Sequence, residues 1–362
     1  MKSFTATFDN FKSCLSLSQE EIESDESLLS EKYIQISKAA QELFAQDKFR
    51  VRHIRTWSMQ DDMGVPVQFR RLLDVDAFFF ENLVRFLRSL NPLLLPIFYF
   101  QKVALLDDLR IIQESGAIDI LLANPVDETP HVRDVYRRGL YKFNSRYLRY
   151  IYLANQIRKN DLLSQERYQI HLDIGNFYGG LQALLKTYYP KTTFISIELP
   201  HQLFRSYLFH SELYPDTEKI VGLEQFVSYM SNPVRKPAFV YLLPRDFDQL
   251  GDLCEINLLS NYVSFGEMSE ENFKRYLASK TIKRVKKFHF VNRFVSNPRF
   301  DPTFNANIKL PDYFIAGTRV KLLDIFPIHH YSITRRKLLG RKGYRNASSP
   351  QFELIQERMS ED

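Results

Sequence analysis

The sequence predicts an α/β fold in which a mainly helical region precedes a parallel sheet covered by helices on both faces. Three observations favour this fold class. Apolar residues recur at helical spacing in several parts of the first 150 residues. After Glu166, short apolar runs alternate with helical segments, as they do in parallel sheets. The first of these runs ends in a glycine turn, DIGNFYGGL, that opens a helix. Ligands of such sheets bind at the carboxyl ends of the strands, so we expect function in the loops that follow them.

The N-terminal region shows helical patterns over residues 31–47, 76–90 and 145–162. The third pattern mixes tyrosines with arginines, which is compatible with nucleic-acid binding, but an amphipathic helix with a solvated cationic face is the better explanation. The apolar segment at residues 90–100 is shorter than the ~20 residues that span a bilayer. We expect it to be buried structure or an apolar substrate wall.

The second half of the chain holds the strand candidates. They cover residues 168–174, 193–198, 239–243, 255–259 and 287–292, with a later pair at 313–318 and 320–325. Helical segments between them cover residues 179–188, 201–212, 246–250 and 269–279. We therefore predict a helical region at 1–150, a sheet domain at 151–330 and a basic, mobile tail at 331–362.

Composition narrows the functional class only moderately. The 362 residues are 44% apolar and carry a formal net charge of +6, which is weak evidence for nucleic acid, and none is expected as a partner. Cys14 and Cys254 are far apart, so neither a disulfide framework nor a zinc site is indicated. The N-terminus has no apolar core of signal-peptide length, and we expect a cytoplasmic location.

The glycine turn carries the first functional signal. Asp173 and Gly175 end the first strand, and Gly179 and Gly180 open the next helix, where glycines permit positive φ and free N–H groups favour an anionic ligand. The following strand ends in Glu198, close to the ~20 residues after the turn at which an acidic side chain accepts ribose hydroxyls. Together these features favour a nucleoside-containing cofactor, either nicotinamide or S-adenosylmethionine.

Four motifs extend this signal: DIGNFYGGL, IELP, NYVSFGEM and VNR. Their combination resembles the sugar O-methyltransferase family, relatives of S-adenosylmethionine-dependent enzymes from bacterial surface-polysaccharide gene clusters. The resemblance covers residues 144–294, and SFGEM with VNR is its most distinctive part. It implies a Rossmann-like class I methyltransferase domain, S-adenosylmethionine as cofactor and a sugar or glycan hydroxyl as acceptor, with the helical region as a cap on the acceptor site.

The resemblance also implies a set of cofactor contacts. Those at the methionine end and the sugar are Asp173, Gly175, Asn176, Phe177, Gly179 and Gly180. Glu198 would hold the ribose hydroxyls, Leu199 would border the adenine, and Asp246 would lie near the adenine edge. Asn261, Ser264 and Glu267 would lie where the sulfonium methyl meets the acceptor hydroxyl.

A base that removes the hydroxyl proton is expected near this point. Glu267 is the first candidate, although a carboxylate that satisfies a helix entry explains it equally well. His329 and His330 are the second candidates, against the alternative of ordinary surface or core histidines.

Paired acids at Asp61–Asp62 and at Asp246 and Asp248 lack a cation-loop pattern, so helix capping is the better explanation and we predict no metal. The basic runs at 280–287 and 335–345 could attract an anionic glycan or membrane, but a solvated helix end and a tail explain them better. A homo-oligomer is compatible with the sequence.

Phe177 stands where the family has its middle glycine, and Asn176 replaces another glycine. The ring either turns away and lets the cofactor bind, forms an aromatic wall that alters affinity, or blocks the site. The last case would make the chain a non-catalytic binding subunit of a glycan-modifying system. A nicotinamide-dependent oxidoreductase is disfavoured, since a further properly spaced glycine set is missing.

Overall fold

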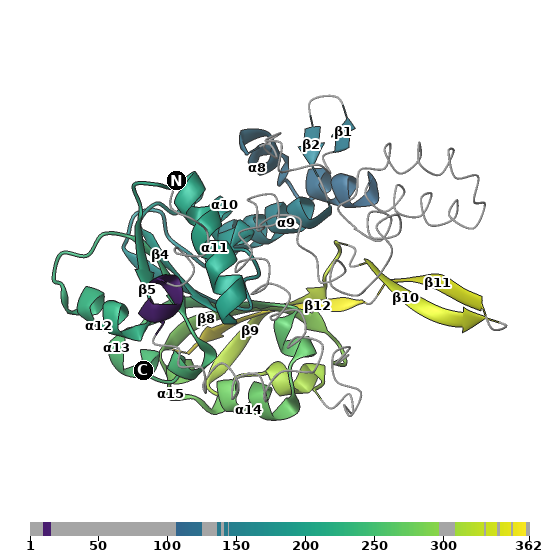
Figure 1. The fold of residues 1–362 in the computed structure, drawn as a ribbon. Coiled ribbons are helices and arrows are strands. Elements are labelled where there is room, and N and C mark those ends of the chain that lie inside the picture. The colour runs from purple at the N-terminus through teal and green to yellow at the C-terminus, as the bar shows by residue number, and fades with distance from the viewer. Residues whose placement is uncertain are drawn as a thin grey trace. The chain divides into compact units, whose positions relative to one another are not determined.

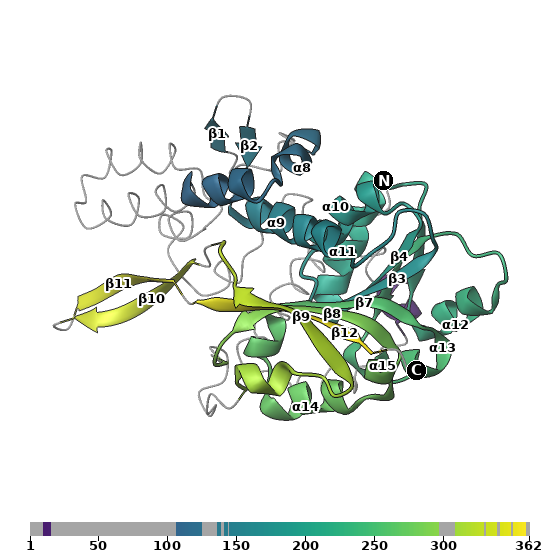
Figure 2. The same ribbon diagram turned by 180° about the vertical axis from the view of Figure 1, so that it is seen from behind.

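The computed structural model describes residues 10–15, 106–124, 136–138, 141–143, 145–296, 308–328, 331–338, 341–348 and 350–359 (Figures 1 and 2). The helices predicted at 31–47 and 76–90, the apolar segment at 90–100, the Asp61–Asp62 pair, and His329 and His330 lie outside these residues. The described residues fall into two compact units. The first draws on 1–54, 161–325 and 352–362, and the second on 55–160 and 326–351. The units are interleaved in sequence, whereas we expected three consecutive blocks.

The first unit is built on an 8-stranded sheet with the order β5-β6-β4-β3-β7-β8-β12-β9. The strands are β3 (Gln169–Ile174), β4 (Thr192–Ile197), β5 (Glu218–Val221), β6 (Ala238–Leu242), β7 (Ile256–Tyr262), β8 (Val285–Arg293), β9 (Thr318–Ile325) and β12 (Gln351–Arg358). All pairings from β5 through β8 are parallel, and β12 pairs with β9 in antiparallel register.

The strand order confirms a doubly wound α/β fold. If β3, β4, β6, β7 and β8 are numbered one to five along the chain, their order in the sheet is 3-2-1-4-5, the order of Rossmann-like sheets. The additional strand β5 extends the edge beyond β6. The chain order reverses between β3 and β7, and a ligand crevice is expected outside the carboxyl ends of these strands.

Helices connect and cover the parallel strands (Figures 1 and 2). They are α10 (Gly180–Tyr188), α11 (Pro200–Leu213), α12 (Leu223–Ser231), α13 (Leu250–Leu253), α14 (Glu270–Ala278) and α15 (Lys280–Lys283), with short 3-10 turns η2 (Pro244–Asp246), η3 (Ser264–Glu267) and η4 (Leu310–Tyr313). Every residue of β4 and β6 is buried, which explains why these strands are nearly continuous apolar runs. The Ser269 side chain caps α14 by accepting the Asn272 N–H at 3.1 Å.

Three expectations need correction. Residues 313–318 are not a strand: η4 ends at Tyr313 and β9 begins only at Thr318. The region 246–250 is divided between η2 and α13. The tail expected to be mobile contains β12, a buried strand of the main sheet, where Gln351, Glu353 and Gln356 are polar yet buried. Because of these polar residues, the sequence pattern of this segment is typical of an exposed segment.

The second unit contains a helix at residues 106–114, α8 (Ile118–Ala123), the hairpin β1 (Tyr136–Arg138) and β2 (Tyr141–Phe143), α9 (Ser145–Lys159), and the hairpin β10 (Tyr331–Leu338) and β11 (Arg341–Ser348). The predicted helix at 145–162 is confirmed, with its end at Lys159. Its Arg158 contacts Asp119 at 2.5 Å and Asn155 at 2.8 Å, so this cation is used within the unit. No helix in the described ranges has the length and apolar character needed to cross a membrane.

Candidate functional site

The glycine turn lies at the carboxyl end of β3, beside the point where the strand order reverses. Gly175, Phe177 and Gly179 have φ values of +79°, +58° and +78°, and the Gly175 N–H donates to the carbonyl of Ile197 at 2.9 Å. Glycine adopts this conformation without a steric cost, but a side chain bears about 1–2 kcal/mol. The backbone at Phe177 therefore has the positive φ that glycine favours, and the phenylalanine is strained in this conformation.

The Phe177 ring packs toward α11. The Arg205 guanidinium lies 4.5 Å from the ring centroid, and the Tyr178 ring meets it edge-on at 5.4 Å. Arg205 is itself buried and donates to Gln202 at 2.7 Å. These contacts place the ring against Arg205 on α11 and against Tyr178.

Two of the turn's glycines are required by the chain's own packing. A Cβ on Gly175 would lie 2.1 Å from the Ser264 hydroxyl, and a Cβ on Gly179 would lie 2.4 Å from Nε2 of His210. His210 Nε2 contacts the Gly179 carbonyl at 2.9 Å, and its Nδ1 contacts the Tyr241 hydroxyl at 2.9 Å. Burial lowers the pKa of His210 to about 3, so the ring is neutral, with Nε2–H donating to Gly179 and Nδ1 accepting from Tyr241. His210 thus fixes the turn, a role that no sequence pattern indicated.

Asn176 holds the turn to the rest of the unit. Its amide donates to the Ser196 hydroxyl on β4 at 2.7 Å, with longer contacts of 3.4 Å to Gln182 and Ser206. The residue is only 7% exposed. The Asn176 side chain therefore holds the turn against β4, and only the Asn176 backbone remains as a predicted cofactor contact.

Asp173 and Glu198 bring carboxylates to the ends of the first two strands. Burial raises the pKa of Asp173 to about 7, and the negative charge of Glu198 adds to this, against a hydrogen bond from Ser260 at 2.7 Å. Burial likewise raises the pKa of the partly exposed Glu198 to about 7, and the charge of Glu267 raises this pKa further. The backbone amides of Leu199 and Phe177 and the charge of Arg205 act in the opposite direction and lower it. Glu198 thus interacts electrostatically with Asp173 and with Glu267, and this group of carboxylates favours a cation there.

Asn261 and Asn292 hold the turn after β7. Asn261 donates to the Ile174 carbonyl at 2.8 Å and accepts from the Phe265 amide at 3.0 Å. Asn292 accepts from the Gly266 amide at 3.0 Å and donates to the Asn261 side-chain oxygen at 3.0 Å. Both residues are fully buried, so these amides of the NYVSFGEM and VNR motifs serve to position η3.

Ser264 and Glu267 belong to η3. The Ser264 hydroxyl donates to the Ile174 carbonyl at 3.0 Å and lies against Gly175. Glu267 is 21% exposed and accepts from Arg293 at 3.3 Å, and Arg293 is only 2% exposed. A buried arginine therefore orients the Glu267 carboxylate, which the helix-entry alternative did not anticipate.

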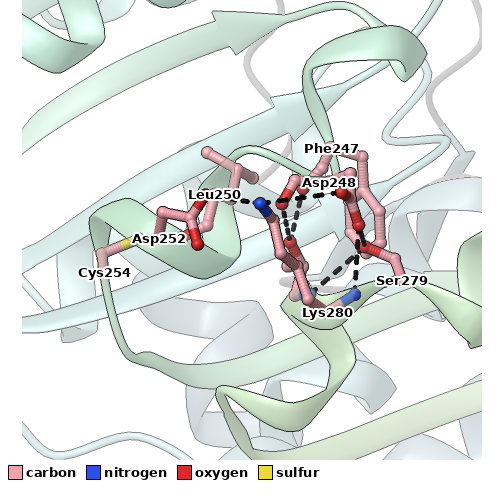
Figure 3. A network of polar contacts seen from close by, with 8 residues as sticks. Phe247, Asp248, Leu250, Asp252, Cys254, Ser279 and Lys280 are labelled. Carbon is pink, nitrogen blue, oxygen red and sulfur yellow. Dashed lines mark hydrogen bonds and ion pairs between the residues drawn. The ribbon is translucent and has the colours of Figure 1, made fainter.

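The remaining predicted contacts lie after β4 and β6. Leu199 is partly exposed and precedes α11 as its N-cap residue. Asp246 is buried and accepts the Leu243 amide at 2.9 Å, so it caps η2. Asp248 accepts from the Ser279 hydroxyl at 2.6 Å and the Lys280 amide at 3.1 Å, which ties the turn before α13 to the start of α15 (Figure 3). Both acids thus have the capping contacts that the sequence suggested.

Within the ranges that the structure describes, no group of three or more His, Cys, Asp or Glu side chains is arranged to hold a metal ion.

No protein-family model matches the chain, and no curated protein matches it. Among solved structures, it is similar to an S-adenosylmethionine-dependent methyltransferase from Clostridium acetobutylicum at 10% identity, covering 58% of this chain and 91% of the other with a TM-score of 0.35. Magnesium protoporphyrin IX methyltransferase from Synechocystis, with S-adenosylmethionine bound, is 9% identical over 59% of this chain and 80% of its own, with a TM-score of 0.35. An S-adenosylmethionine-dependent methyltransferase from Anabaena variabilis is 8% identical over 68% and 93%, with a TM-score of 0.35. The fold assignment rests on the strand order.

Proposed function

We propose that this chain binds S-adenosylmethionine at the carboxyl ends of β3, β4 and β7 and transfers its methyl group to a sugar hydroxyl. One observation supports the cofactor most strongly. Glu198 ends the second strand beside the glycine turn, and Asp173 and Glu267 interact electrostatically with it. An acid at this strand tip suits ribose hydroxyls, and a set of carboxylates suits a sulfonium cation.

The residues present fit this cofactor at its ribose and its charge. An ionised carboxylate offers about four acceptor positions. The amides of Leu199 and Phe177 use some of those on Glu198, which leaves capacity for ribose hydroxyls. Less space is available for the cofactor at Gly175, because the Ser264 hydroxyl fills the space beside its Cα. The methionine end of the cofactor would have to lie beyond this hydroxyl.

When bound, S-adenosylmethionine would supply an electrophilic methyl group. The chain's own residues would align the acceptor, exclude water and take up the hydroxyl proton. Glu267 is the proposed base, since it is partly exposed on η3 and is oriented by Arg293. Such a base contributes about 10²–10⁴-fold to the rate.

The proposal includes a sugar acceptor in surface polysaccharide or glycan biosynthesis, with the helical region as a cap, and these parts rest on the resemblance of the sequence motifs. It also includes a cytoplasmic location, which rests on the N-terminal sequence. The alternative is a non-catalytic binding subunit of the same fold, and the strain at Phe177 and the Ser264 contact are the observations that favour it.

Activity separates these two functions. The purified protein would be incubated with S-adenosylmethionine and a panel of free, nucleotide-linked and oligomeric sugars, and S-adenosylhomocysteine would be measured. We expect turnover with one acceptor class and a loss of about 10²–10⁴-fold in kcat for Glu267→Gln, with the cofactor Kd unchanged. Cofactor binding without turnover on any acceptor would favour the binding subunit, and wild-type kcat in Glu267→Gln would exclude this base.

A further inference from the structure

Arg293 is a buried cation whose hydrogen-bond donors are only partly used. It is the last residue of β8 and of the VNR motif, and it is 2% exposed. Its Nη2 donates to Glu267 Oε1 at 3.3 Å, which is long for a charge-assisted hydrogen bond. Among the described residues, its Nε and Nη1 have no hydrogen-bond partner. A guanidinium carries five N–H donors, so the contact with Glu267 leaves more than half of them unused.

The charge of Arg293 is also only partly balanced. Among the described residues, Glu267 is the one acid within ion-pair distance of it, and this carboxylate is 21% exposed, so that water screens its charge. Buried charges are normally paired and hydrogen-bonded. The guanidinium therefore favours a further anion beside it.

A second buried donor lies close by. The Tyr313 hydroxyl is fully buried and has no hydrogen-bond partner in the described part of the chain. A Cβ built on Gly266 would lie 3.9 Å from this hydroxyl and 4.0 Å from the Arg293 backbone nitrogen, so both residues border η3. Burial raises the pKa of Tyr313, and the charge of Arg293 opposes this effect. The unused groups are thus a cation and a neutral hydroxyl, and both can donate to one acceptor.

These donors lie on the acceptor side of the proposed site. β7 and β8 are neighbouring parallel strands, so η3 and Arg293, which follow and end them, share one edge of the sheet. Glu267, the proposed base, contacts Arg293 directly. A group held by Arg293 would therefore lie beside the hydroxyl that Glu267 deprotonates. Because Glu267 is the exposed member of the pair, access to the guanidinium requires rotation of its side chain, a change that is common at binding sites.

We propose that Arg293 binds a carboxylate of the acceptor, and that the acceptor is an acidic sugar of the hexuronate type. The inference rests on the proposed function, which puts the acceptor hydroxyl at Glu267. A carboxylate carries one negative charge and balances one guanidinium, whereas a phosphate dianion would leave an excess of negative charge next to Glu267. A neutral sugar would leave the buried donors without an acceptor, and a site with such donors discriminates against it.

Matched pairs of sugars test this proposal. Glucuronate, galacturonate and mannuronate would be titrated into the protein by calorimetry, beside glucose, galactose and mannose, with and without S-adenosylhomocysteine. One hydrogen bond to a charged group corresponds to about 10- to 150-fold in Kd. We expect one hexuronate to bind at least about tenfold more tightly than its neutral parent. Equal affinity within all three pairs, or no binding of any hexuronate in either condition, would overturn the proposal.

Two variants separate carboxylate binding from the orientation of Glu267. Arg293→Met removes the guanidinium and should reduce the preference for the hexuronate to less than about threefold. Glu267→Gln removes the competing acid and should keep the preference or increase it. If Arg293 only orients Glu267, both variants would change the preference alike, and that result would contradict the proposal. Arg275→Met is the control, since Arg275 is an exposed cation on α14, and it should match the wild type.

Thermal unfolding shows whether each variant is folded. If Arg293→Met does not fold, Arg293→Gln replaces it, since the amide is polar but has no charge, and it should lose the preference as well; a wild-type preference in this protein would refute the proposal. If the hexuronate preference holds and S-adenosylmethionine does not bind, the acidic-sugar site stands and the proposed methyl transfer fails. If the cofactor binds and only neutral sugars are methylated, the proposed function stands and this inference fails.

Discussion

Glu198→Gln tests the assignment of the ribose site. The substitution keeps the shape of the side chain but removes its charge and one acceptor oxygen. A hydrogen bond to a charged group contributes about 1.5–3 kcal/mol, and 1.4 kcal/mol corresponds to tenfold in Kd. We therefore expect the Kd for S-adenosylmethionine to rise by about 10- to 150-fold.

The pH dependence of S-adenosylmethionine binding gives a second test of the ribose assignment. Because burial raises the pKa of Glu198 to about 7, the wild-type carboxylate is mostly ionised at pH 8 and mostly protonated at pH 6. We expect ionisation of Glu198 alone to account for about a tenfold fall in wild-type affinity from pH 8 to pH 6. The variant should lack this tenfold component and retain only the dependence due to Asp173.

Calorimetry at both pH values provides the assay, with Glu224→Gln as the control, since Glu224 is an exposed acid on α12. A Glu198→Gln protein that binds with wild-type affinity at pH 8 would refute the ribose assignment.

Three further predictions concern the turn and its acids. Asp173→Asn should stabilise the fold by about 4 kcal/mol at pH 8 and by almost nothing at pH 3, because a raised carboxyl pKa favours the folded state fully below the unfolded pKa of about 4 and loses that contribution as pH rises to about 7; chemical denaturation at both pH values measures this, and equal effects would contradict the burial argument. Gly179→Ala should destabilise by at least about 1 kcal/mol more than Gly317→Ala, since both have positive φ but only Gly179 meets a close neighbour, His210; equal losses would show that His210 moves aside. Phe177→Gly should change stability by less than about 1 kcal/mol, since relief of strain offsets the lost contact with Arg205, and should change the cofactor Kd by less than about threefold; a Kd at least tenfold tighter would show that the ring obstructs the site.

The order of strands and helices around the turn could be predicted because each depends on local sequence. β3, β4, β6 and β7 are apolar runs, and positive φ at Gly175 and Gly179 requires glycine. Strand β5 was not predicted, since its four residues include Glu218 and Lys219. β12 escaped detection because buried polar residues interrupt its apolar pattern.

The acidic residues of the site could be predicted from the sequence, but the residues that contact them could not. Glu198 and Glu267 stand in motifs, whereas the contact of Glu267 with Arg293 depends on the neighbouring ends of β7 and β8. His210 contacts Gly179, which is 31 positions away in the sequence, and His289 contacts Glu353, which is 64 positions away. Contacts between residues so far apart leave no pattern in the local sequence. Asn261 was expected to face the cofactor, but its amide is used inside the protein.

Cofactor binding by the wild-type protein tests the central claim most directly. Titration of S-adenosylmethionine at pH 8, followed by calorimetry and thermal shift, should show one site per chain, with most of the affinity lost in Glu198→Ala. No heat and no thermal shift at millimolar S-adenosylmethionine would contradict the assignment of this sheet edge as a methyl-donor site.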